Sequence, residues 1–180
     1  MAIARWKPRQ TYTKVEEWLM RRLGRTRKLF AFLRAQRHAL FDDVFQAELE
    51  SMYRDTGAGK PAVPPALLAM VTLLQAYLKV SDAEAVELSV MDRRWQLVLD
   101  CLEATEPPFS QGALGEFRVR LIRTDMDRRR LERTVAVARQ SKAFDARKLP
   151  KTLRVAFDAS ALEGAGRVED TINLLGHAAR

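Results

Sequence analysis

The sequence predicts a mainly α-helical protein, a helical bundle that is followed by the first strand of an incomplete second domain. Apolar residues recur at three- and four-residue spacing along most of the 180 residues, the period of helices that bury one face. Several of these stretches follow residues that cap helix N-termini. Only residues 153–158, Leu-Arg-Val-Ala-Phe-Asp, are typical of a strand, and a lone strand leaves its backbone groups unpaired.

Three helices are expected in the first 60 residues, after an arm at residues 1–12. The first begins at a capping box made by Thr13 and Glu16, and Gly24 ends it. Its inward face is predicted to carry Val15, Trp18 and Leu19. A second helix is expected over residues 27–39.

The later helices are predicted from their start signals. N-cap residues precede four of them: Asp42, Ser81 (in a capping box with Glu84), Ser110 and Asp127. Pro65 suits the first turn of another helix, which is apolar almost all round and therefore central to the bundle. The loop at residues 57–65 is a candidate boundary. The predicted regions are 1–60, a basic helical region, 61–145, a helical DNA-binding region, and 146–180, the start of the strand-containing domain.

Charge is unevenly distributed along the chain. The net charge is +8, but residues 1–60 carry +6, residues 61–107 carry −4 and residues 108–150 carry +6. A basic excess of this kind favours a polyanionic partner, and arginine, which dominates residues 108–150, suits bidentate phosphate contacts. Solvated helix faces are the alternative explanation.

Segments 66–79, 82–91 and 111–123 have the lengths and short turns of a helix-turn-helix-like unit with a basic third helix. This pattern predicts a DNA-binding surface on the third helix and on the one that follows it. The candidate DNA-binding residues are Arg118, Arg120, Arg123, Arg129, Arg130 and Arg133. The basic segment from Arg21 to Lys28 is the next candidate.

Several motifs together resemble bacterial insertion-sequence transposases of the DDE type with an InsH-like N-terminal domain. The resemblance covers nearly the whole chain. The motifs are residues 63–70 (Val-Pro-Pro-Ala-Leu-Leu-Ala-Met), 94–101 (Arg-Trp-Gln-Leu-Val-Leu-Asp-Cys), 108–122 (Pro-Phe-Ser-Gln-Gly-Ala-Leu-Gly-Glu-Phe-Arg-Val-Arg-Leu-Ile) and 157–171, which begins Phe-Asp-Ala-Ser-Ala.

The resemblance implies a helical domain that binds the terminal inverted repeats of the element, followed by an RNase H-like catalytic domain. Asp158 would be the first catalytic and metal-binding carboxylate, and Mg²⁺ is expected as the cofactor of a full-length enzyme. The remaining carboxylates of the family lie far downstream. We therefore expect this chain to be truncated, to hold no cofactor and to be inactive alone. The family's Asp-Ser-Ser-Pro is Asp158-Ala-Ser-Ala here.

Two alternatives remain open on the sequence: a truncated stand-alone regulator that occupies the element's ends, and a helical protein–protein adaptor. Self-association, or pairing with a full-length transposase, is a further expectation. The single Cys101 and the absence of a signal peptide or membrane span predict a cytoplasmic protein. The resemblance implies that this protein is bacterial and nucleoid-associated.

Overall fold

The computed structural model describes residues 3–53, 62–141 and 143–144, which form eight helices and no strand. The helices are α1 (Lys14–Thr26), α2 (Lys28–Leu40), α3 (Asp43–Glu50), α4 (Pro65–Leu78), α5 (Asp82–Met91), α6 (Arg93–Leu99), α7 (Gln111–Arg123) and α8 (Met126–Gln140). The mainly helical fold class is thus confirmed for these residues. The predicted strand at 153–158 and the whole region 146–180 lie outside them.

Most of the predicted start signals act as N-caps. Thr13 and Ser81 form complete capping boxes with Glu16 and Glu84, and the side chains of Asp42 and Ser110 accept the expected backbone hydrogen bonds. The prediction for the last helix was wrong, because α8 begins two residues earlier, after Asp125. Asp125 takes a left-handed conformation (φ 56°), which lets α8 follow α7 after a turn of only two residues.

One other boundary differs from the prediction. Gly24 does not end α1, which continues to Thr26 because an isolated glycine weakens a helix without stopping it. The end of α5 at Met91 agrees with the predicted segment 82–91, and Asp92 both ends α5 and caps α6.

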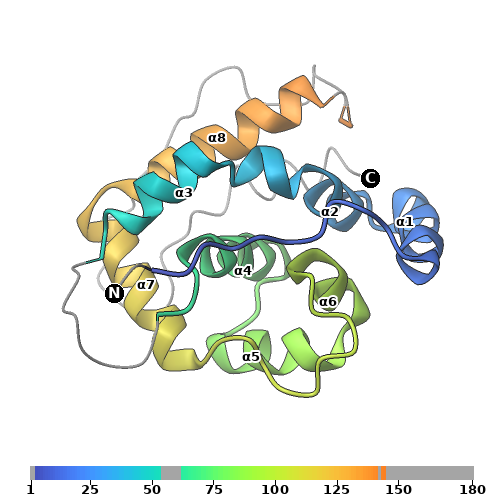
Figure 1. Cartoon of the computed structure of the whole chain (residues 1–180), viewed down its shortest axis with the longest axis horizontal. Coiled ribbons are helices and arrows are strands. Elements are labelled where there is room, and N and C mark those ends of the chain that lie inside the picture. The colour runs from blue at the N-terminus through green and yellow to red at the C-terminus, as the bar shows by residue number, and fades with distance from the viewer. Residues whose placement is uncertain (1–2, 54–61, 142, 145–180) are drawn as a thin grey trace.

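The bundle is built around α4, as the sequence predicted (Figure 1). Every residue of α4 from Pro65 to Gln75 is buried, and the helix packs against α3, α5, α6 and α7. Since α2 also packs on α6 and α8, residues from both sides of the predicted boundary near residue 60 share one hydrophobic core.

Helices α4 and α5 are joined by a three-residue turn and are bent by 103° relative to each other. Helix α7 packs on both of them. In the part of the chain that is described, no single helix has the length and hydropathy needed to cross a membrane.

The segment before α1 is an extended arm that lies along the bundle. Trp6 is buried, its ring meets that of Phe41 edge-on at 5.9 Å, and its backbone N–H and C=O both bond to the Gln46 side chain. Farther along, the backbone N–H of Arg9 donates to the Asp100 carboxylate at 2.9 Å. The arm therefore runs from α3 to the end of α6 before α1 begins.

Candidate nucleic-acid interface

The predicted DNA-binding arginines lie on α7 and α8, and several of them join helices to one another. Arg118 binds the Asp82 carboxylate at 2.6 Å and Gln75 Oε1 at 3.4 Å, so it connects α7 to the start of α5 and the end of α4. The hydrogen bond from Arg118 lowers the pKa of Asp82 below its ordinary value. This contact holds together the three helices of the predicted helix-turn-helix-like unit.

Arg133 joins α8 to the junction between α2 and α3. Its guanidinium donates to the carbonyl oxygens of Ala39 and Leu40, each at 2.7 Å, and to the carboxylate of Asp42. These carbonyls end α2 and would otherwise lack a helical partner, and Asp42 is the N-cap of α3. Arg133 therefore fixes a helix junction.

Arg130 is inside the protein, with 6% of its surface exposed. It donates to the Thr72 hydroxyl of α4, and its Nε has no partner among the described residues. Burial lowers the pKa of Arg130 to about 10, which still leaves the side chain charged at neutral pH. A phosphate could reach this guanidinium only if α8 moved away from α4.

The other three predicted arginines are nearer the solvent. Arg129 makes a two-point ion pair with Glu48 at 3.0 and 3.2 Å. Arg120 pairs with Glu116 on its own helix and lies 4.5 Å from the centre of the Tyr53 ring. Arg123 is exposed and forms no ion pair within the described residues. It is therefore the only one of the six that is exposed and unpaired in this part of the chain.

Helix α1 carries a different kind of basic surface, which we call the α1 basic face. It consists of Lys14, Trp18, Arg21, Arg22 and Arg25, all exposed. None of its four cations forms an ion pair within the described residues. The inward side of α1 is instead made by Glu16, Leu19 and Leu23.

The prediction for this helix was wrong in one respect. Val15 and Trp18 were expected to face inward, but 45% and 53% of their surfaces are exposed. In place of these two apolar side chains, the carboxylate of Glu16 faces inward and is completely buried.

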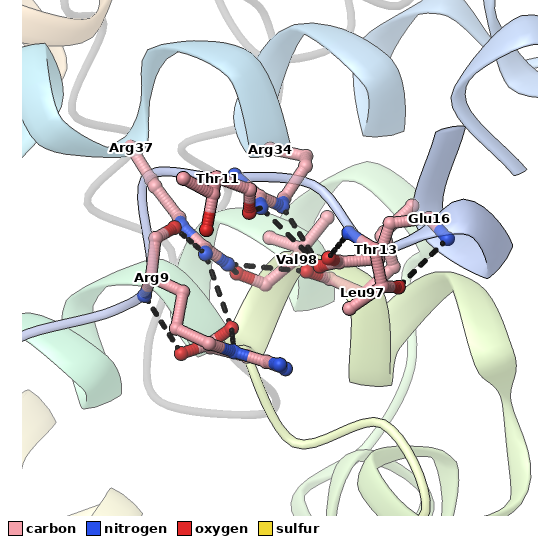
Figure 2. Close-up of polar contacts among 9 residues, drawn as sticks. Arg9, Thr11, Thr13, Glu16, Arg34, Arg37, Leu97 and Val98 are labelled. Atoms are coloured by element: carbon pink, nitrogen blue, oxygen red, sulfur yellow. Dashed lines mark hydrogen bonds and ion pairs between the residues drawn. The ribbon is translucent and has the colours of Figure 1, made fainter.

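Glu16 is buried because it has charged and polar partners (Figure 2). One oxygen accepts from Arg34 Nη2 at 3.2 Å and Nε at 3.3 Å, and the other accepts the Thr13 backbone N–H at 2.8 Å. Arg34, 1% exposed at its side chain, also donates to the carbonyl oxygen of Thr11 and lies over the Tyr12 ring. This buried ion pair, together with the buried Leu19 and Leu23, thus holds α1 against the bundle with its basic face outward.

A second buried arginine on α2 holds the arm (Figure 2). Arg37 donates to the Leu97 and Val98 carbonyl oxygens at the end of α6, to the Arg9 carbonyl oxygen and to Asp100. Burial, followed by repulsion from Arg34, lowers the pKa of Arg37 to about 10. Arm, α1, α2 and α6 are therefore one connected unit.

Among the described residues, no three His, Cys, Asp or Glu side chains form a group that could hold a metal ion. Asp158, the carboxylate that the sequence assigned to catalysis and metal binding, lies outside these residues.

Comparison with known proteins identifies the family of this chain but finds no matching individual protein or structure. Residues 25–120 match the family model described as a transposase domain (DUF772), and this match spans more than half of the chain. No curated protein and no solved structure matches the sequence. The matched range includes α2 to α6 and most of α7, whereas nearly all of α1 precedes it. The chain belongs to the DUF772 transposase domain family.

Proposed function

We propose that this protein binds DNA as the N-terminal recognition part of an insertion-sequence transposase of the DDE type, with the terminal inverted repeats of the element as its target. The observation that carries the proposal is the transposase-domain match in a chain of net charge +8. A transposase acts on DNA, and an excess of cations is the usual electrostatic signature of phosphate binding.

The arrangement of α4, α5 and α7 supports a helix-turn-helix-like unit. The 103° bend between α4 and α5, with three residues between them, falls in the range of roughly 90–120° that is typical of the motif. Helix α5 carries Asp82, Glu84 and Glu87 and no basic residue, so it is poorly suited to approach phosphates. The basic helix α7 is the better candidate for the groove.

Within this proposal, α7 and α8 contact DNA through Arg123 and through Arg120 and Arg129. The acidic partners of the last two are surface carboxylates, and ion pairs in water are weak enough to be exchanged for phosphates. Arg118, Arg130 and Arg133 support the surface from within by joining helices.

The catalytic part of the proposal rests on the sequence resemblance. Asp158 would be the first carboxylate of a DDE site, and a full-length enzyme would use Mg²⁺ there to stabilise charge at the phosphorus.

The test is a titration of the whole protein with DNA from the ends of the element and with scrambled DNA, at roughly 50 and 200 mM salt. We expect tighter binding to the element's ends and a log K that falls linearly with log salt. Binding that is absent at low salt, or that does not change with salt, would refute a DNA-binding function and favour the adaptor.

A further inference from the structure

We infer that the α1 basic face is a DNA-backbone-binding surface of this protein, in which Lys14, Arg21, Arg22 and Arg25 contact phosphates and Trp18 packs on the sugars or bases between them. The inference rests on the proposed DNA binding. It extends the second predicted candidate, the basic segment from Arg21 to Lys28, to a surface that includes Lys14 and Trp18, and most of this surface precedes the residues that match the family.

The first support is the geometry of the helix. Lys14, Trp18, Arg21 and Arg25 are spaced i, i+4, i+7 and i+11, which places them along one line of an α-helix, and Arg22 lies beside them. The buried Leu19 and Leu23 are on the opposite side. Four cations and one aromatic ring therefore share one solvent-facing stripe on α1.

The second support is the contrast with α7 and α8. There, five of the six predicted arginines are bound to side chains of the protein itself. The partners are Asp82, Glu48, Thr72, Glu116 and Asp42. The cations of the α1 basic face have no ion-pair partner within the described residues, and Arg27 and Lys28 add two more exposed cations where α1 meets α2. Glu17 is the only exposed carboxylate on the helix. Within the described residues, a phosphate would thus not have to displace an existing ion pair to contact any of these four cations.

The third support is Trp18. The other two tryptophans, Trp6 and Trp95, are buried, whereas 53% of Trp18 is exposed among free cations. An aromatic ring between basic groups is the combination that nucleic-acid surfaces use, since cations hold the backbone and the ring stacks or covers a sugar. Covering this exposed ring with DNA would also remove apolar surface from water, which favours binding.

The chemistry of the stripe favours DNA over an anionic membrane. A helix that lies in a membrane surface turns a broad apolar face toward the lipid, but the apolar face of α1 is committed to the protein core. Outward, only Trp18 and Val15 are apolar. Three of the four cations are arginines, whose planar fork suits bidentate contact with phosphate oxygens.

The surface is also held rigidly in place. The buried Glu16–Arg34 pair and the capping box of Thr13 fix the first turn of α1, so little conformational freedom is lost when its basic face binds.

The test compares two charge-matched double variants in the full chain. Arg21→Gln/Arg25→Gln removes two cations from the α1 basic face. Arg93→Gln/Arg139→Gln, the control, removes two exposed arginines that are also without ion pairs within the described residues, from α6 and α8, and neither is among the proposed DNA contacts. Glutamine has nearly the helix propensity of arginine, so both variants should keep their helical circular dichroism.

We expect Arg21→Gln/Arg25→Gln to reduce the salt slope of log K by about 1.8 and the affinity by on the order of 50-fold near 0.1 M salt. The effect should be similar on element-end and scrambled DNA, because phosphate contacts carry no sequence information. If this variant binds like wild type, the inference is overturned, while DNA binding by wild type would leave the proposed function intact. No binding by wild type would overturn both.

Trp18 supplies an independent readout. Acrylamide, which is neutral, should quench mainly Trp18 in the free protein, and saturating DNA should protect it. Trp18→Phe should abolish this DNA-dependent change, and Trp18→Ala should weaken binding by about fivefold or more with an unchanged salt slope. Unchanged acrylamide quenching at saturating DNA would show that DNA does not cover α1.

Discussion

Carboxylate–arginine ion pairs contribute very differently to the stability of this protein, depending on how deeply they are buried. The Glu16–Arg34 pair is almost completely buried, whereas Arg128 and Glu132 pair in solvent on α8. Removing one member of a buried pair leaves an uncompensated charge in the interior, which is far more costly than losing an exposed pair.

We therefore predict that Glu16→Ala lowers the free energy of unfolding by about 3–5 kcal/mol. The matched change on the surface, Glu132→Ala, should cost about 0.5 kcal/mol or less. Urea unfolding followed by circular dichroism measures both. Equal effects of the two substitutions would show that the Glu16–Arg34 pair does not anchor α1.

Asp82 makes the free energy of unfolding depend on pH in the acidic range. Because Arg118 lowers its folded-state pKa, the ionised carboxylate stabilises the fold at pH values above its unfolded-state pKa of about 3.8. That contribution is lost as the pH falls through the folded-state pKa. Asp82→Asn should therefore destabilise the protein at roughly pH 6 and much less at roughly pH 2–3. Unfolding free energies of the two proteins at both pH values check this, and a constant difference would contradict it.

At the scale of elements, Arg133 shows how a predicted DNA contact acts as a link between helices. Arg133→Ala would leave the Ala39 and Leu40 carbonyl oxygens and Asp42 without this donor. We expect a loss of about 1.5–3 kcal/mol, compared with less than about 1 kcal/mol for Arg129→Ala, whose pair with Glu48 is exposed.

DNA affinity provides the control for this prediction. Measured well below the unfolding temperature, the affinity of Arg133→Ala should equal that of wild type, because its guanidinium is already occupied by protein groups. A large loss of DNA affinity with unchanged stability would instead show that Arg133 contacts DNA.

The helices themselves were largely predictable, because their signals are local. The capping boxes of α1 and α5 and the proline at the start of α4 lie within one turn of the boundary that they set. The inward face of α1 was not predictable in this way. Glu16 is buried because its carboxylate pairs with Arg34, which lies eighteen residues later in the chain. Hydropathy alone does not include this partner and therefore ranks Trp18 as the better core residue.

The candidate site was predicted less well for the same reason. Composition correctly located two basic regions, but it could not separate arginines that join helices from arginines that face solvent. The partners of Arg118, Arg129 and Arg133 are Asp82, Glu48 and Asp42, all 36 or more residues away in the chain. Only packing brings these groups together.

At the scale of the whole molecule, the extended arm connects parts of the bundle that are far apart in sequence. Trp6 packs on Phe41, Arg9 reaches Asp100, and the Thr11 carbonyl oxygen accepts from Arg34 just before α1 begins. The arm thus contributes to the core that α2, α3 and α6 share, and it leads directly into the helix that carries the proposed DNA-binding face.

This arrangement gives the two tryptophans at this end of the chain opposite roles. Trp6→Ala should cost about 3 kcal/mol or more, because it removes a large buried side chain and leaves a cavity beside Phe41. Trp18→Ala removes an exposed ring and should change stability by about 0.5 kcal/mol or less, while it weakens DNA binding. Urea unfolding and DNA titration of both variants give the four values needed. If Trp18→Ala destabilised the protein as much as Trp6→Ala, Trp18 would belong to the core and the α1 basic face would lose its aromatic contact.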